Sequence, residues 1–149
     1  MQVKELGHVV LFVRSLEKSV HFYRDILGFN QIESEMAMPV AAFSTGRTHH
    51  ELLLIEVGPN AALPAKGRRA GLYHIGLKVG TTLDELRTAK AELEAADVTI
   101  VGMSDHYVTN SLYLQDPDGN EVEIYIDVQP EVWRENPQAV LAPTRALHL

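Results

Sequence analysis

The sequence has no cysteine, no long hydrophobic run and no excess of positive charge, and each absence excludes a class of function. Without cysteine there are no disulfide bonds, thiolate ligands or cysteine nucleophile, so histidines and carboxylates remain as the strong metal ligands. No stretch approaches the roughly 18 consecutive apolar residues of a membrane span. The N-terminus lacks the apolar core of a secretion signal, and the formal net charge of −7 offers no basic surface for nucleic acid. We therefore expect a cytoplasmic protein that binds neither nucleic acid nor membranes.

The first part of the chain, residues 5–57, predicts a strand, a helix and three further strands. Val9–Val13 is a short apolar run typical of a strand. Ser15 is a candidate N-cap for a helix from Leu16 to Leu27 that presents Val20, Tyr23 and Leu27 on one face, and Gly28 would end it. The strand-like segments that follow are Asn30–Ser34, Val40–Phe43 and Leu52–Val57.

Residues 72–127 predict the same order of elements a second time. His74–Val79 reads as a strand, and Thr81 or Thr82 can cap a helix whose predicted inner face is Leu83, Leu86, Ala89, Lys90 and Leu93. Three more strands are predicted at Val98–Val101, Ser111–Leu114 and Glu121–Ile126, the last two joined by a turn at 116–120.

The repeat predicts an α+β fold built from two βαβββ modules. The modules span about 5–57 and 72–127, lie in a single domain 1–127, and are joined by a Pro- and Gly-containing linker at 58–71. Residues 128–149 are expected to form a docked C-terminal tail. Two such modules would make a curved mixed sheet around a central metal cleft.

Four potential metal ligands occupy similar places in the two modules. His8 and His74 begin the first strands, 66 positions apart, and Glu56 and Glu123 lie near the ends of the last strands, 67 apart. His8, His74 and Glu123 match a facial two-histidine, one-carboxylate site, which leaves positions open for substrate and O2. Iron(II) suits this set, with manganese(II), nickel(II) and zinc(II) as alternatives. A simpler interpretation places Glu123 on the wet face of a half-buried sheet with Glu121 and Tyr125.

Several segments resemble the glyoxalase/bleomycin-resistance/extradiol-dioxygenase superfamily, also called the vicinal-oxygen-chelate superfamily. They are Gly7–Leu11 with Phe22–Phe29, Leu72–Leu77, and Asp116–Tyr125, and the resemblance covers about residues 5 to 127. It implies the paired-module fold and the metal ligands His8, His74 and Glu123. It is less specific for the reaction, because members include isomerases, epimerases, lyases, dioxygenases and drug-binding proteins.

Two further segments are similar to catechol extradiol dioxygenases, namely His49–Leu54 and Asp105–Tyr113. The similarity implies an iron(II) enzyme that cleaves an aromatic diol with O2. His50 would be the acid/base that stabilises reduced oxygen, and His106 and Tyr113 would donate hydrogen bonds to the substrate. Each also has a structural interpretation: a polar turn for His50, an exposed loop for His106 and a core position for Tyr113.

Two other functions remain open at this stage. A glyoxalase I-like or epimerase-like enzyme would use Glu56 as a fourth ligand and abstract a proton beside a carbonyl. Alternatively, the scaffold binds a small molecule, such as a drug, without catalysis. Whichever function applies, the open sheet edges favour a homodimer.

Overall fold

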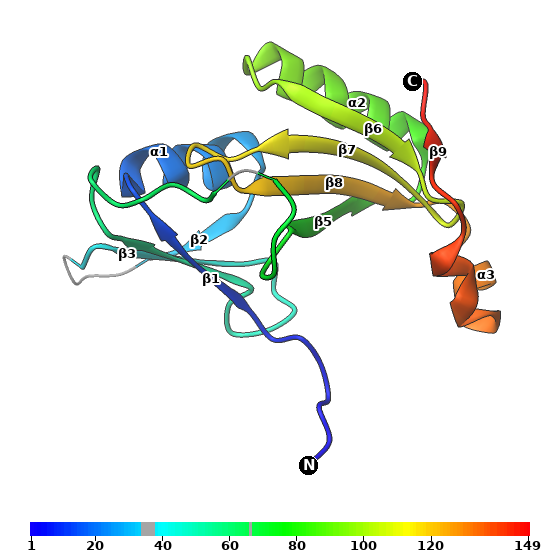
Figure 1. The fold of residues 1–149 in the computed structure, drawn as a ribbon, viewed down its shortest axis with the longest axis horizontal. Coiled ribbons are helices and arrows are strands. Elements are labelled where there is room, and N and C mark those ends of the chain that lie inside the picture. The colour runs from blue at the N-terminus through cyan, green and yellow to red at the C-terminus, as the bar shows by residue number, and fades with distance from the viewer. Residues whose placement is uncertain (34–37, 66) are drawn as a thin grey trace. The chain divides into compact units, whose positions relative to one another are not determined.

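The computed structural model describes residues 1–33, 38–65 and 67–149 and divides into two compact units, Met1–Ala65 and Lys66–Leu149 (Figure 1). The boundary falls inside the linker predicted at 58–71. Each unit contains one mixed sheet with helices, so the α+β class is confirmed.

The first unit follows the predicted order of strand, helix and three strands. It contains β1 (Val9–Val13), α1 (Leu16–Val20), η1 (His21–Ile26), β2 (Asn30–Ile32), β3 (Val40–Ser44) and β4 (Leu52–Glu56). The sheet order is β1-β4-β3-β2, with β1 parallel to β4 and the other neighbours antiparallel. The end of the strand predicted at Asn30–Ser34 lies outside the described residues.

The single helix predicted from Leu16 to Leu27 is interrupted. Ser15 caps α1 as predicted, but the chain then widens into the π-helix η1, where the Leu27 amide donates to the Phe22 carbonyl at 3.0 Å, five residues back. Gly28, at φ +75°, follows the helix. The wider turn shifts the buried face, so the buried side chains of this segment are Ser19, Phe22 and Tyr23 rather than the predicted Val20, Tyr23 and Leu27.

The second unit repeats the order of elements. It contains β5 (His74–Gly80), α2 (Leu83–Ala95), β6 (Ile100–Asp105), β7 (Thr109–Gln115) and β8 (Glu121–Asp127). Thr82, rather than Thr81, is the N-cap of α2, and it forms a capping box with Glu85. The core of α2 is Leu86 and Leu93, both on the predicted face.

The C-terminal tail is part of the second unit. It forms α3 (Pro130–Glu135), η2 (Pro137–Leu141) and the short strand β9 (Arg145–Ala146). Strand β9 pairs antiparallel with β6, so the sheet order is β5-β8-β7-β6-β9. The tail is therefore attached to the sheet by backbone pairing.

Each sheet packs one face against a helix of its own unit, α1 in the first and α2 in the second. In the second unit α2 packs on β5, β7 and β8, and the inward residues Val122, Ile124 and Ile126 are buried. Glu121 and Glu123 alternate with them and lie on the opposite face. The alternation expected for this strand is thus confirmed, and the candidate ligand Glu123 lies on the face away from α2.

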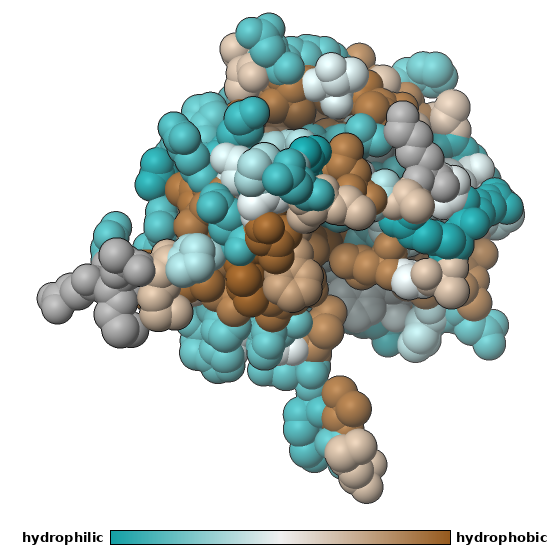
Figure 2. Space-filling view, turned by 60° about the vertical axis from the view of Figure 1, so that its left-hand side comes forward, coloured by the Kyte–Doolittle hydropathy of each residue, from teal (hydrophilic) through white to brown (hydrophobic). Residues whose placement is uncertain are grey.

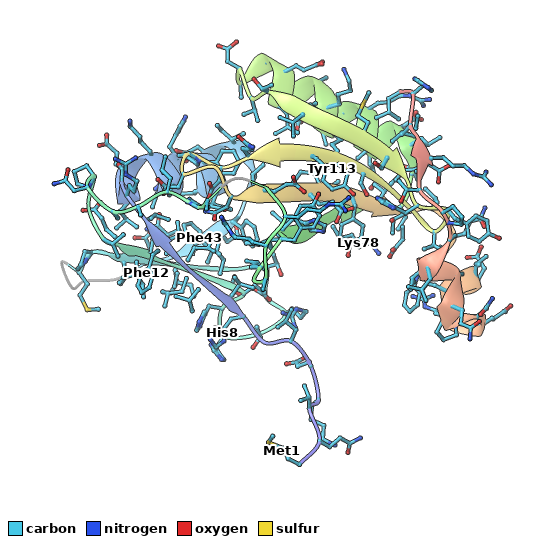
Figure 3. All side chains as sticks on the ribbon, in the orientation of Figure 1. Met1, His8, Phe12, Phe43, Lys78 and Tyr113 are labelled. Carbon is cyan, nitrogen blue, oxygen red and sulfur yellow. The ribbon has the colours of Figure 1, made fainter. Side chains whose placement is uncertain are left out.

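In the first unit, the sheet face away from α1 is apolar. A row across the sheet pairs Val10 with Leu53, Leu53 with Ala42, and Ala42 with Ile32. Phe12 lies on the same face and is 69% exposed, whereas Phe43 on the helix side is fully buried (Figure 3). The space-filling view shows such hydrophobic side chains exposed among hydrophilic ones (Figure 2). None of the described helices is long and apolar enough to cross a membrane.

Candidate metal centre

His74 and Glu123 form the most closely associated pair of predicted ligands. His74 begins β5, Glu123 lies on the adjacent β8, and their Nε2 and Oε2 atoms are 3.1 Å apart. Two neighbouring ligands of an octahedral ion, each bound at about 2.1 Å, lie about 3 Å apart. The separation fits two adjacent positions on one ion. The buried His74 Nδ1 atom lies 3.5 Å from Oε1 of Glu121, too far for a hydrogen bond of ordinary geometry.

Tyr113 and His106 extend this pair into a connected chain of polar side chains. The Tyr113 hydroxyl donates to Oε1 of Glu123 at 3.1 Å, and Nε2 of His106 lies 2.7 Å from the same hydroxyl. Burial and the negative charge of Glu123 raise the pKa of Tyr113, so its hydroxyl stays protonated and able to donate. Tyr113 therefore holds one oxygen of Glu123 and leaves the other facing His74.

The turn between β7 and β8 fixes the register that brings Tyr113 opposite Glu123. The buried Asp116 carboxylate accepts from the Asp118 and Asn120 amides at 3.0 and 2.8 Å, and from the Asn120 side chain at 2.9 Å. Gly119 adopts φ +86°, a conformation that L side chains rarely adopt. The turn predicted at 116–120 is confirmed, and Tyr113 pairs directly with Glu123.

In the first unit, the structure brings His8 beside the histidine pair that precedes β4. The His8 and His50 ring centroids are 4.5 Å apart, and the His49 and His50 Nδ1 atoms are 2.6 Å apart. Burial, reinforced by the neighbouring imidazoles of His49 and His8, lowers the pKa of His50, and Glu51 opposes this. The His50 Nε2 atom is buried and unpaired within the described residues. His50 is therefore a neutral base next to a predicted ligand.

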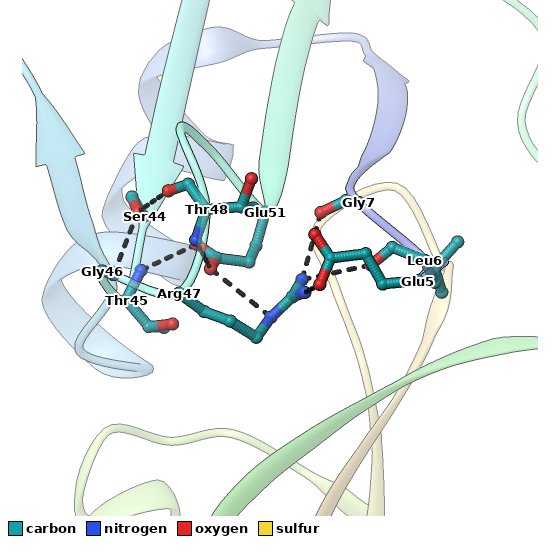
Figure 4. Close-up of polar contacts among 9 residues, drawn as sticks. All are labelled: Glu5, Leu6, Gly7, Ser44, Thr45, Gly46, Arg47, Thr48 and Glu51. Carbon is teal, nitrogen blue, oxygen red and sulfur yellow. Dashed lines mark hydrogen bonds and ion pairs between the residues drawn. The ribbon is translucent and has the colours of Figure 1, made fainter. Parts of the chain in front are cut away.

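Arg47 links the loop that precedes the pair His49 and His50 to the chain just before His8 by hydrogen bonds (Figure 4). One guanidinium nitrogen donates to the carbonyls of Leu6 and Gly7 at 3.2 and 3.1 Å. Glu51 braces the other side by accepting from the Thr45 and Thr48 amides at 2.8 and 3.0 Å, and it lies 3.6 Å from Arg47. Arg47 and Glu51 thus hold the ends of two segments so that His8 meets His50.

The predicted equivalence of Glu56 and Glu123 is wrong. Glu123 pairs with the residue two positions after His74. In the first unit, the residue two positions after His8 is Val10, and it pairs with Leu53. Leu53 therefore stands where the second module has Glu123. Counting positions along the chain missed this, because the two modules have different loop lengths between their strands.

Glu56 instead forms a hydrogen bond with the N-terminus of α1. It pairs with Val13 on the side of β4 that packs against the helix, and its Oε2 accepts the Leu16 amide at 2.7 Å. This amide is one of the donors that a helix leaves unpaired at its first turn, where a negative charge is also favoured by the helix dipole. The local geometry of Glu56 is that of a helix cap.

The predicted site residues are brought together in two groups. One group is His74, Glu123, Tyr113 and His106 in the second unit; the other is His8 and His50 in the first. Across residues 1–33, 38–65 and 67–149, no three or more histidine, aspartate or glutamate side chains are grouped to hold a metal ion.

Sequence reasoning missed two polar partners of these groups. Thr144, in the tail, lies 3.1 Å from Nδ1 of His106. Arg47 belongs to a loop for which no function was predicted. Neither residue carries a sequence signal, because each acts on a segment about 40 positions away, which only the folded chain places beside it.

Comparisons with known proteins identify the fold and the family. A solved glyoxalase/dioxygenase from Nostoc punctiforme has the same fold, with a TM-score of 0.69, 21% identity, and 83% of this chain and 91% of that chain covered. A catechol-2,3-dioxygenase of Bacillus subtilis is 34% identical over 87% of this chain, and biphenyl-2,3-diol 1,2-dioxygenase 3 of Rhodococcus globerulus is 32% identical over 82%. This chain spans only 44% and 63% of those two relatives.

A third relative has a different reaction in its name. Human mitochondrial methylmalonyl-CoA epimerase is 33% identical over 60% of this chain and 52% of its own length. The model of the Glyoxalase/Bleomycin resistance protein/Dioxygenase superfamily matches residues 5–124, which include both units' sheets almost entirely. The chain therefore belongs to the Glyoxalase/Bleomycin resistance protein/Dioxygenase superfamily.

Proposed function

We propose that the protein is an iron(II)-dependent extradiol dioxygenase that cleaves a catechol-type aromatic diol with O2. The proposed ligands of the ion are His8, His74 and Glu123. The observation that carries the proposal is the chain of contacts from His74 through Glu123 and Tyr113 to His106. It joins two proposed ligands to the two residues that the resemblance assigns to the substrate side.

The proposed catalytic residues have chemical tasks that fit their surroundings in the structure. When bound, iron(II) supplies one centre at which both diol oxygens and O2 meet. His50, kept neutral by its lowered pKa, accepts a proton from the diol and later returns it. Tyr113 stays protonated and donates its one hydroxyl proton to Glu123, which orients that proposed ligand. His106 contacts the Tyr113 hydroxyl and is the second residue proposed to bind the substrate.

Glu56 distinguishes this proposal from the isomerase or lyase alternative. A four-ligand site would need Glu56 to face the same side of its sheet as the leucine that replaces Glu123, but Glu56 lies on the helix side and accepts the Leu16 amide. A site with three protein ligands would leave room on the ion for both diol oxygens and O2. The position of Glu56 thus favours the dioxygenase over the four-ligand alternative.

An epimerase-like activity is the second candidate, because the human epimerase is one of the relatives. It would act without O2 and would depend on Glu56 as a ligand. Activity of the metal-loaded protein on a 2-methyl-substituted acyl thioester under nitrogen, lost on Glu56→Ala, would favour this candidate. A protein that takes up no divalent metal at all would favour non-catalytic binding of a small molecule.

We also propose that the protein is a homodimer. Its first sheet presents the exposed hydrophobic residues Val10, Phe12 and Ile32, and sheet edges are prone to pair with another chain. Light scattering is expected to give twice the 16.6 kDa mass of one chain. A mass of one chain at micromolar concentration would contradict the dimer.

Anaerobic reconstitution with iron(II), followed by a panel of catechols, tests the proposed activity. We expect one O2 consumed per diol, with both oxygen atoms in a yellow ring-opened product. Glu123→Gln and His74→Ala should abolish O2 uptake because each removes a proposed ligand. Arg87→Gln, on the exposed surface of α2, is the matched control and should retain it. Iron-loaded protein that consumes no O2 with any catechol would contradict the proposal.

A further inference from the structure

Strand β5 carries a glycine, Gly76, directly opposite the proposed ligand Glu123. The two residues pair across β5 and β8, so they share the sheet face away from α2. A glycine inside a strand weakens it, because glycine loses more conformational freedom on folding and has no side chain to pack. Such a glycine often marks a bulge or a place where a ligand approaches the backbone closely. Gly76 therefore needs a specific explanation.

The other two strand glycines of the second unit have structural explanations. Gly80 ends β5 beside the start of α2, and a Cβ there would collide with the Glu85 side chain. Gly102 lies in β6 where the register shifts after Ile100, and glycine is common at such bulges. Gly76 has neither feature: the pairing around it is regular, its φ lies outside the left-handed region, and a Cβ would meet no collision.

The space above Gly76 lies next to the Glu123 oxygen that faces His74. A Cβ on Gly76 would lie 3.4 Å from Glu123 Oε2 and 3.5 Å from Tyr125 Cε1. Oε2 is the atom 3.1 Å from His74, whereas Oε1 accepts the Tyr113 hydroxyl. Gly76 itself is exposed. The missing side chain thus leaves an open space between the Tyr125 ring and the carboxylate oxygen that is proposed to bind the ion.

We propose that Gly76 is a specificity-determining residue that leaves room for the ring of the diol beside Glu123, with the Tyr125 ring as a wall of that space. The inference rests on the proposed dioxygenase function, which places the diol next to this carboxylate. A planar ring suits the space because aromatic rings pack favourably on one another. A side chain at position 76 would compete with the diol for this volume and would leave His74 and Glu123 in place.

Anaerobic titration of iron(II)-loaded protein with 4-nitrocatechol, followed by its colour change, tests the inference without turnover. Gly76→Ala should raise the Kd about tenfold, a change typical of one added methyl group in a binding pocket, while keeping one iron per chain. Gly76→Val should raise it further. Gly102→Ala is the matched control, because its Cβ would make an ordinary contact 3.6 Å from the Tyr113 ring at the other end of the row. It should keep the wild-type Kd.

NMR of the zinc(II)-loaded wild type provides a readout that needs no substitution. The ring of bound 4-nitrocatechol should shift the amide signal of Gly76 more than the signals of Gly80 and Gly102. This comparison decides the inference even if Gly76→Ala does not fold, which thermal unfolding of the metal-free variant will show. A Gly76 signal that shifts no more than the other two would overturn the inference.

The remaining outcomes separate the inference from the proposed reaction. An unchanged Kd in Gly76→Ala would overturn the inference and leave Gly76 as a strand glycine covered by the Tyr125 ring. Loss of iron in Gly76→Ala, or an equally raised Kd in Gly102→Ala, would also overturn it. A wild type that binds no 4-nitrocatechol would reject both. Binding that weakens only in the Gly76 variants, in a protein that consumes no O2 with any catechol, would uphold the inference and reject the reaction.

Discussion

Tyr113 is the central residue of the polar group in the second unit, because it contacts both Glu123 and His106. The sequence alone did not assign a role to Tyr113; the role came from the family resemblance. Its contacts come from the pairing of β7 with β8, in which Tyr113 lies directly opposite Glu123. The ten-residue spacing in sequence is thus the length of one tight hairpin.

Tyr113→Phe should lower kcat about 10- to 100-fold, because a hydrogen bond to a charged group contributes about 1.5–3 kcal/mol. Affinity for iron(II) should fall as well, since Glu123 loses the donor that orients it. Steady-state kinetics and metal titration measure the two effects. Tyr107→Phe, whose side chain is exposed, is the matched control. Unchanged kcat in Tyr113→Phe would remove Tyr113 from the mechanism.

Glu56→Ala should destabilise the fold and leave metal binding intact. The carboxylate accepts the Leu16 amide at the start of α1, and loss of such a cap costs about 0.5–2 kcal/mol. Urea unfolding of wild type, Glu56→Ala and Glu56→Gln should rank the glutamine variant between the other two. If Glu56→Ala instead loses its metal while remaining folded, the four-ligand alternative is correct.

At the scale of elements, sequence patterns predicted the order of strands and helices better than their bounds. The caps Ser15 and Thr82 and the turn at 116–120 follow from local chemistry, and all three are confirmed. The π-helix His21–Ile26 was not predictable, because the same apolar residues fit a regular helix equally well. The alternation of buried and less buried side chains along β8 could be predicted, because successive side chains of a strand point to opposite faces of the sheet.

The capping box of α2 has a consequence for stability that depends on pH. The Thr81 amide, with the hydroxyl and amide of Thr82, stabilises the Glu85 carboxylate and lowers its pKa. Because the folded pKa lies below the unfolded value near 4.5, the stabilisation is complete above that value and is lost as pH falls through the folded pKa.

The difference in unfolding free energy between wild type and Glu85→Gln should therefore shrink as the pH is lowered from 7 to 3. Thr82→Ala should cost about 1 kcal/mol at pH 7, since it removes the other half of the box. Urea unfolding at several pH values measures both, with Thr88→Ala as the helix-surface control. A wild-type advantage over Glu85→Gln that is equal at pH 7 and pH 3 would contradict the assignment of the cap.

At the scale of the whole molecule, the two modules repeat the fold but not the chemistry. The sheet row that contains Glu123 in the second unit is Gly76, Glu123, Tyr113 and Gly102. The corresponding row in the first unit is apolar throughout. The repeat was visible in the sequence, but this asymmetry was not, because pairing register depends on loop lengths. The first module therefore has no carboxylate at the position that Glu123 occupies in the second.

Metal binding should stabilise the folded chain if the ligands come from both modules. Manganese(II), which is stable in air, at about 100 times its Kd adds about 2.7 kcal/mol, which for a chain of this size raises Tm by about 5–10 °C. His8→Ala and Glu123→Gln should each lose most of this rise. A rise that persists in His8→Ala would show that the first module does not contribute a ligand.

The most direct test of the account is the number of divalent ions bound per chain. After anaerobic iron(II) loading and removal of excess metal, elemental analysis should find one ion per wild-type chain and per Glu56→Ala chain. It should find almost none in His8→Ala, His74→Ala or Glu123→Gln. Full occupancy in any one of those three variants, with the protein folded, would contradict the proposed centre.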